Sequence, residues 1–295
     1  MNDDITRIRA LSIWTGDVEP KPLHGGLSNQ SYTVEDAGQK FVVRLGRDYP
    51  FHHVIREREL MTARAAHAAG FAPEIVHAEP GVTVSRFIHG KSFTEADMRA
   101  NIPQVAAIVR RFHDEMPRHV SGPGFIFWPF HVIRDYALTL RAGGSAFSAD
   151  LPGWLALAVE LEAAQVALPI VFGHHDFLPA NIIDDGGRLW LIDFEYAGFG
   201  TAMFDLAGIA SNAGFSAEES QALLGHYFGR APSGEIRRAH AAMQCASLLR
   251  EAIWGMVSRL HLDNPGIDYD AYARMNLERL DAALDAYRTQ FGKET

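Results

Sequence analysis

The first ninety residues alternate between polar and apolar positions in a way that predicts a small β-sheet. Residues 23–45 contain two alternating runs around a turn at 36–38, which is typical of a β-hairpin. Residues 54–69 are typical of a helix that ends at Gly70. Residues 72–88 return to a strand pattern that is interrupted at Pro80. We therefore expect a sheet that carries one helix.

The rest of the chain is dominated by helical patterns. Asn101 is a candidate cap for a helix over residues 101–116, whose apolar positions form one face. Further helices are expected over residues 151–167, 216–228, 239–261 and 269–290. The pattern predicts an α+β fold with two lobes: a sheet-rich N-lobe over 1–88, a joint near 86–90, and a larger helical C-lobe over 89–295.

One stretch in the middle of the C-lobe, "GHHDFLPANIIDDGGRLWLIDFEYAG", combines apolar runs with several acids. The segment "NIIDDGGRLWLID" predicts a hairpin with a turn at 184–187. Closing it should bring Asn181 near Asp193, and Asp176 can face the same point. An amide oxygen and a carboxylate are the hard ligands that Mg²⁺ prefers beside phosphate oxygens.

The remaining acid of this group suggests a reaction. Asp176 could accept a hydrogen bond from a substrate hydroxyl and aim it at the γ-phosphoryl group of a nucleotide. For any single carboxylate, capping a turn is the simpler interpretation. The spacing of Asp176, Asn181 and Asp193 together favours phosphoryl transfer.

The composition limits the surroundings and partners of the protein. Its 295 residues carry a net charge of −9, which argues against nucleic acid as a partner and suits a cationic ligand. Cys245 is the only cysteine, so no disulfide can form within the chain. The most apolar run, residues 125–133, is interrupted by Pro129 and His131, so we expect no membrane insertion and a cytoplasmic location. The oligomeric state stays open.

The motifs "HHDFLPAN" and "LIDFEYAGFG" resemble the catalytic and metal loops of the choline/ethanolamine kinase family, within the aminoglycoside phosphotransferase superfamily. That superfamily shares the protein-kinase fold, and the resemblance covers nearly the whole chain. It implies that Asp176 is the catalytic base or orienter and that Asn181 and Asp193 bind Mg²⁺. Glu195 stands where protein kinases have the glycine of Asp-Phe-Gly, and we expect it near the substrate.

The resemblance also implies residues that bind ATP. "GGLSNQSYTV" is similar to the nucleotide loop of the family, in which Ser28 or Asn29 would approach the triphosphate. Arg44 stands where kinases usually have a lysine that clamps phosphates. It would be held by Glu57 or Glu59, which project about 200° apart on one helix; the family spacing favours Glu59. The backbone around Phe87 would meet adenine.

The substrate implied by the resemblance is a small cationic alcohol, choline first. Tyr196, Trp254 and Tyr272 would form an aromatic cage for its trimethylammonium group, and Asp205 would support that site. A helix-core role for Trp254 remains an alternative, because apolar residues surround it at helical spacing.

Several other functions also stay open. Eukaryotic members of the family have a second tryptophan and a further acid where this chain has Val257 and Asn212. Ethanolamine or another amino alcohol is therefore an alternative substrate. An aminoglycoside- or sugar-directed phosphotransferase is a further alternative. A catalytically silent nucleotide-binding regulator would represent a different class, but it predicts decay of the three motif residues, all of which are present.

Overall fold

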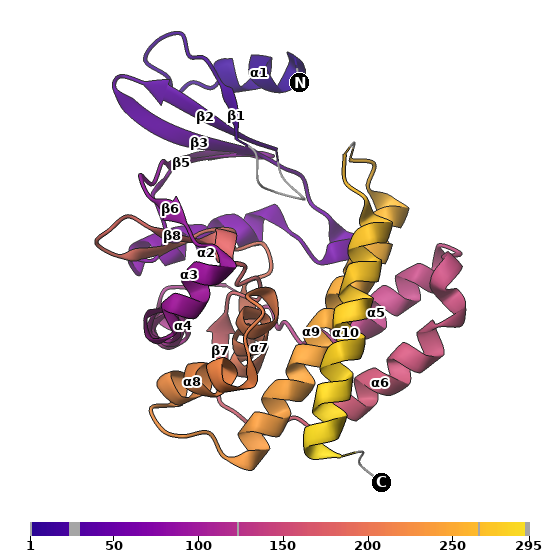
Figure 1. Ribbon diagram of the computed structural model, residues 1–295. Coiled ribbons are helices and arrows are strands. Elements are labelled where there is room, and N and C mark those ends of the chain that lie inside the picture. Colours follow the sequence, from indigo (N-terminus) through magenta and orange to yellow (C-terminus); the bar gives the residue numbers. More distant parts are fainter. Residues whose placement is uncertain (1, 24–29, 123, 265, 293–295) are drawn as a thin grey trace. The chain divides into compact units, whose positions relative to one another are not determined.

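We describe the protein from a computed structural model (Figure 1), which covers residues 2–23, 30–122, 124–264 and 266–292. The chain folds into two compact units. The first comprises residues 1–92, 118–121 and 182–195, and the second comprises the intervening segments and the C-terminal part. The segment 182–195 thus belongs with the N-terminal residues. The predicted lobe boundary between residues 88 and 89 stays a prediction.

The first unit is built on a five-stranded antiparallel sheet with strand order β1-β2-β3-β5-β4. Its strands are β1 (Lys21–Leu23), β2 (Gln30–Asp36), β3 (Gln39–Leu45), β4 (Ile75–Glu79) and β5 (Val82–Arg86). The predicted hairpin is confirmed: Asp36 pairs with Gln39 across a two-residue turn at Ala37 and Gly38, both with positive φ.

The buried face of this sheet follows directly from the alternation in the sequence. Tyr32 and Val34 on β2 share a core with Phe41 and Val43 on β3. Helix α1 (Asn2–Arg9), which the sequence pattern did not predict, completes this core with Ile8. Its short length gives too few apolar repeats for a helical signal.

Two further elements complete the first unit. The predicted helix is confirmed as α2 (Arg56–Ala68). The predicted hairpin in the acidic stretch is confirmed as β8 (Ile182–Asp184) and β9 (Leu189–Leu191), with Ile182 opposite Leu191. Strand β6 (Lys91–Ser92) adds to it as a third strand.

The second unit is mainly helical, and Figure 1 shows its long helices α9 and α10 running beside each other. A short antiparallel pair, β7 (Ile170–Gly173) and β10 (Gly198–Thr201), flanks residues 174–197 in the sequence. The helices are α3 (Glu95–Ala100), α4 (Ile102–Glu115), α5 (Pro129–Ala142), α6 (Leu151–Ala163), α7 (Ala202–Asn212), α8 (Ala217–Phe228), α9 (Gly234–His261) and α10 (Tyr269–Phe291). In the part of the chain that the structure covers, none is long and apolar enough to cross a membrane.

The structure corrects the sequence expectations at several points in this unit. Helices α3, α5 and α7 were not predicted. Pro129, which interrupts an apolar run, lies in the first turn of α5, where a missing N–H costs nothing. Asn101 occupies the cap position of α4, but its side chain donates to the carbonyl of Asp97 and makes no capping bond.

Candidate active site

The loop after β7 brings Asp176 and Asn181 together. The side-chain amide of Asn181 donates to the carbonyl oxygen of Asp176 at 2.9 Å and to its carboxylate at 3.2 Å. Asn181 is buried, whereas Asp176 is half-buried. These bonds use only the amide nitrogen of Asn181, so its oxygen keeps the lone pairs that a hard cation requires.

A buried carboxylate on α7 holds this loop in place. Asp205 accepts backbone N–H bonds from His174 at 2.9 Å and from His175 at 2.7 Å. The ring of His113 on α4 adds a third bond at 2.8 Å, and its other nitrogen meets the hydroxyl of Tyr227. Both carboxylate oxygens are therefore engaged inside the unit, which fits the supporting role expected for Asp205. Its predicted contact with substrate stays a prediction.

These hydrogen bonds set the charge states of the buried groups. Burial alone would raise the pKa of Asp205, but the bond from His113 and the nearby histidines lower it to about 2. Burial lowers the pKa of His175 to about 4, so its imidazole is neutral near pH 7. The loop is thus held by one ionised carboxylate beside a neutral ring.

The backbone of this loop is strained at the residue before Asp176. His175 adopts the left-handed conformation with φ 62°, which costs a non-glycine residue of order 1–3 kcal/mol. Its ring stacks on Phe127 with centroids 4.5 Å apart. A Cβ added to Gly173 would lie 2.3 Å from the His175 ring, so this position requires glycine. The packing therefore dictates the conformation that places Asp176.

Asp193 and Glu195, which belong to the predicted metal loop, take part in a series of ion pairs within the first unit. Arg44 on β3 donates to Glu59 at 2.9 Å and to Asp193 at 2.8 Å. Arg56 pairs with the other oxygen of Glu59 and reaches Glu195 at 3.1 Å. The order Asp193, Arg44, Glu59, Arg56, Glu195 alternates in sign throughout.

The same contacts decide which glutamate on α2 faces Arg44. Glu59 makes the expected pair with Arg44, whereas Glu57 is exposed. Asp193 has a left-handed backbone with φ 68°, a second strained position at a motif residue. Its predicted approach to Asn181 stays a prediction, because Asn181 belongs to the second unit and Asp193 to the first.

Burial and the carboxylates in this series of ion pairs raise the pKa of Glu195 strongly. Burial raises the pKa of Glu195 to about 7, and the neighbouring carboxylates of Asp193 and Glu59 act in the same direction. Burial would lower the pKa of Arg44, but Asp193 and Glu59 outweigh it and raise that pKa. With three acids and two arginines, Glu195 is the group whose charge changes near neutral pH.

The remaining nucleotide-binding predictions are less constrained. Ser28 and Asn29 lie outside the described residues. The backbone N–H of Phe87 donates to the carbonyl of Lys40 at 3.0 Å, and the Lys40 ammonium lies 4.2 Å from the Phe87 ring. The contact of this segment with adenine stays a prediction and would use other backbone groups.

The three predicted cage residues contact one another in the second unit. The indole N–H of Trp254 donates to the hydroxyl of Tyr196 at 2.9 Å. The rings of Trp254 and Tyr272 meet edge to face with centroids 5.6 Å apart. Trp254 and Tyr196 are only 6% and 5% exposed, whereas Tyr272 is half-buried. The three aromatic residues pack against one another. This packing agrees with the alternative in which Trp254 belongs to the helix core, and their role as a cage stays a prediction.

Two charged residues beside this cluster were missed from the sequence. Arg250 is 2% exposed, its guanidinium lies 4.5 Å from the Tyr196 ring, and it donates to Glu251. Glu251 also accepts a bond from the hydroxyl of Tyr272 at 2.7 Å. The sequence contained a clue to both residues: this charged pair interrupts the apolar stretch "LLREAIWGMV" three and four residues before Trp254.

Glu251 lines the same cavity as Asp176, the predicted catalytic base. Asp176, Asn212 and Glu251 line one small cavity of about 10 Å³, which has room for a single water-sized group. A carboxylate therefore faces this cavity from α9, while position 212 supplies a neutral amide. The cavity thus has the carboxylates of Asp176 and Glu251 in its lining, and Glu251 links it to the aromatic ring of Tyr272.

These features define the class of protein. A small antiparallel sheet carrying an arginine–glutamate pair, and a helical unit carrying the Asp176–Asn181 loop, form the α+β protein-kinase-like fold. The chain belongs to the phosphotransferase enzyme family, whose profile matches residues 19–243. It is therefore a phosphotransferase.

Comparisons with individual proteins agree with this membership. Protein LicA of Haemophilus influenzae is 26% identical over 272 residues, which cover 88% of this chain and 77% of that protein. Ethanolamine kinase 2 of Mus musculus is 25% identical over 284 residues, covering 86% of this chain and 72% of that protein. The crystal structure of a choline/ethanolamine kinase family protein from Mesorhizobium loti has a TM-score of 0.77 and 25% identity, and covers 99% of both chains.

Proposed function

We propose that this protein is a Mg²⁺·ATP-dependent kinase that phosphorylates the hydroxyl of a small amino alcohol, choline first. The observation that carries the proposal is the placement of Asp176 and Glu251 on one cavity, beside the cluster of Tyr196, Trp254 and Tyr272. An alcohol whose cationic nitrogen lies three bonds from its hydroxyl oxygen suits this combination. The names of the relatives, which include ethanolamine and choline/ethanolamine kinases, support the substrate class.

Asp176 acts on the acceptor. Its carboxylate is held by the amide of Asn181, and its loop is held by Asp205. It accepts the hydrogen bond of the substrate hydroxyl and points the oxygen at the γ-phosphorus of ATP; as the phosphorus–oxygen bond forms, the proton passes to the carboxylate. The phosphoryl group leaves ADP and joins the substrate oxygen.

The residues present fit a magnesium ion. Asn181 offers its amide oxygen and Asp193 a carboxylate, which are the donors that Mg²⁺ takes from proteins when phosphates supply the rest. The ion would neutralise charge on the phosphates. Asp193 also pairs with Arg44, so its carboxylate could exchange the guanidinium for a bound cation and would stay paired throughout.

Arg44 clamps the phosphates of the nucleotide in the proposed complex. Glu59 holds one side of its guanidinium and so leaves the fork oriented rather than free to rotate. Fork geometry suits two phosphate oxygens at once, which a lysine could not match.

Ethanolamine is the second candidate, and a specific observation favours it. Trp254 and Tyr196 are nearly covered, and the guanidinium of Arg250 already lies against Tyr196. The most accessible cation partners are therefore Glu251 and Tyr272. A primary ammonium can donate hydrogen bonds to a carboxylate, whereas a trimethylammonium group cannot.

The test is ATP-dependent phosphorylation of choline, ethanolamine, its mono- and dimethylated forms, an aminoglycoside and a simple sugar. Asp176→Ala is the blank; its turnover should fall by ~10²–10⁴ while ATP binding persists. Rates that rise with methylation support choline, and rates that fall support ethanolamine. Turnover of only the aminoglycoside or the sugar would refute the proposal, as would an active Asp176→Ala variant.

A second variant separates the two amino alcohols. Glu251→Gln should lower kcat/KM more for ethanolamine than for choline, because only the primary ammonium loses a charged hydrogen-bond partner. The control is Glu278→Gln on α10, an exposed glutamate, which should change neither value.

A further inference from the structure

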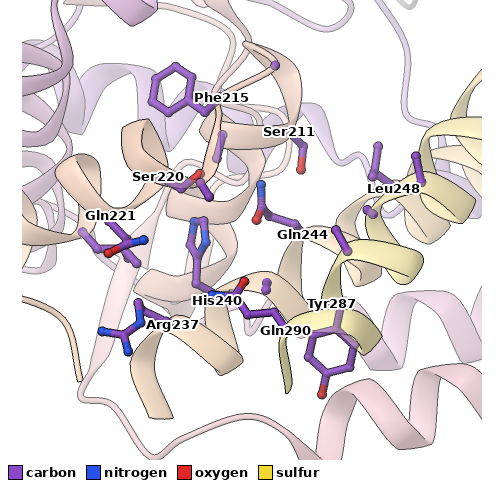
Figure 2. A pocket seen from close by; sticks show the side chains of 18 of the residues that line it. Ser211, Phe215, Ser220, Gln221, Arg237, His240, Gln244, Leu248, Tyr287 and Gln290 are labelled. Atoms are coloured by element: carbon purple, nitrogen blue, oxygen red, sulfur yellow. The ribbon is translucent and has the colours of Figure 1, made fainter. Parts of the chain in front are cut away.

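A cavity of about 460 Å³ lies inside the second unit, at the far end of α7 from Asp205. Four helices line it: the C-terminal end of α7, then α8, α9 and α10 (Figure 2). None of the residues assigned to catalysis, nucleotide or substrate lines it. Its volume falls in the range of small-molecule sites, which is about 300–1,000 Å³.

Small side chains on facing helices leave this space unfilled. Ala282, Ala283 and Ala286 line it from α10, and Ala241 lines it from α9. Residues three and four apart share one face of a helix, so α10 presents a single alanine-rich side to the cavity. The neighbouring polar side chains therefore border open volume instead of being packed.

Two buried polar atoms at this cavity lack a partner. His240 is 2% exposed, and its ring hydrogen-bonds to the backbone of Leu206, but its Nε2 atom has no partner. Ser211 is 8% exposed, and its hydroxyl also has none. Figure 2 shows the His240 ring and the Gln244 amide projecting from α9 toward this space. A buried polar group without a partner costs about 1–3 kcal/mol.

The state of His240 defines what a ligand must bring. Because the ring donates to the Leu206 carbonyl through the other nitrogen, Nε2 is a hydrogen-bond acceptor. Burial lowers the pKa of His240 to about 4, so the ring stays neutral near pH 7. A ligand that satisfies Nε2 must carry an O–H or N–H donor.

The charges around the cavity define the rest of the ligand. Arg237 on α9 and Arg279 on α10 line it, and no aspartate or glutamate is among the described lining residues. Arg237 donates to the carbonyl of Pro232, and Arg279 donates to Asn276 and to the backbone of Ser211. Neither guanidinium pairs with a carboxylate in the described part of the chain. The cavity is therefore positive and favours an anion.

We propose that this cavity is a second ligand site, separate from the kinase site, for a small hydroxy acid. The carboxylates of the ligand meet Arg237 and Arg279, and its hydroxyl donates to Nε2 of His240. The hydroxyl of Ser211 gains a partner at the same time. This inference does not depend on the identity of the alcohol that the enzyme phosphorylates.

Calorimetric titration of the full-length protein with malate tests the site. Malate carries two carboxylates and one hydroxyl, and we expect a Kd of about 1 mM or tighter. Succinate lacks the hydroxyl, and dimethyl malate lacks the charges, so both should bind at least about tenfold more weakly. Absence of malate binding, or equal binding of the three compounds, overturns the proposal.

Variants locate the binding. Arg237→Met keeps an unbranched apolar stem but removes the guanidinium and its charge, and it should weaken malate binding at least about tenfold. His240→Leu should do the same if it folds, and Arg237→Met keeps the test decisive if it does not. Arg259→Met, an exposed arginine on the same helix, is the control and should bind like wild type. Equal affinity of Arg237→Met and wild type places the binding elsewhere and refutes the site.

Discussion

The two units of this protein hold buried charge in different ways. In the first, the side chains of Asp193, Arg44, Glu59, Arg56 and Glu195 alternate in sign, and each arginine contacts two carboxylates. In the second, the buried carboxylate of Asp205 accepts hydrogen bonds from two backbone amides and from the ring of His113. The first arrangement consists of side chains that can exchange partners, and the second is tied to the backbone.

This difference separates a binding role from a scaffolding role. A side chain such as Asp193 can leave Arg44 for a ligand cation, and Arg44 retains Glu59. Asp205 cannot leave its partners without releasing the backbone that places Asp176. Substitutions in the series of ion pairs from the first unit should therefore alter kinetics more than stability. Substitutions at Asp205 should alter stability first.

The largest expected effect tests the scaffold. Asp205→Ala removes a fully buried charge and leaves His113 and two amides without their acceptor, which should lower the free energy of unfolding by about 3–5 kcal/mol. Urea denaturation measures it, with the exposed Asp281→Ala on α10 as the control. A loss below about 1 kcal/mol would show that Asp205 does not anchor the loop.

The next effect tests the series of ion pairs around Arg44. Arg44→Met should lower kcat/KM for ATP by about tenfold to a hundredfold if Arg44 clamps the phosphates as proposed. Arg86→Met on the neighbouring strand β5 removes a more exposed arginine and should leave the kinetics unchanged. Kinetics with varied ATP and urea denaturation are measured together. If stability falls while kinetics are retained, Arg44 is a scaffold like Asp205.

A pH profile sharpens the contrast within the first unit. The folded pKa of Glu195, about 7, lies above the ordinary value of 4.5, so the folded state binds the proton more tightly than the unfolded state. The contribution of Glu195 to stability should therefore decline as pH rises from about 4.5 to about 7 and then level off. In Glu195→Gln this decline should be absent.

The measurement is the free energy of unfolding of both proteins across that pH range. Glu57→Gln, at an exposed position of α2, is the control and should follow the wild-type profile. Parallel profiles for wild type and Glu195→Gln would rule out Glu195 as the group that titrates near neutral pH.

The smallest effect probes the edge of the buried network. Tyr227→Phe removes only the hydroxyl that meets His113 at 2.8 Å, and should cost about 0.5–1.5 kcal/mol of stability. Tyr287→Phe on α10, also at a buried tyrosine, should cost less than about 0.5 kcal/mol. Equal costs for the two variants would mean that the Tyr227 hydroxyl adds nothing to the network.

Local patterns predicted much of the fold and the motif loops. The hairpins at 36–39 and 184–189 and the long helices α9 and α10 follow from alternation and helical spacing within short windows, and helix α2 was predicted from its end at Gly70. The proximity of Asp176 and Asn181 is of the same kind, because five residues separate them on one loop. Short helices such as α1 and α3 escaped prediction, since they contain too few apolar repeats to give a period.

Contacts between distant segments could not be read from such windows. His113 meets Asp205 across 92 residues, and Arg44 meets Asp193 across 149. Glu251 was overlooked because its neighbours predict a buried helix, and only the packing of α9 places it beside Asp176. The sequence by itself determined the hairpins, the principal helices and the placement of Asp176 and Asn181 on one loop, since these depend on spacing along the chain. The tertiary structure decided which charges meet across distant segments and which cavities open, because those depend on how helices and strands pack.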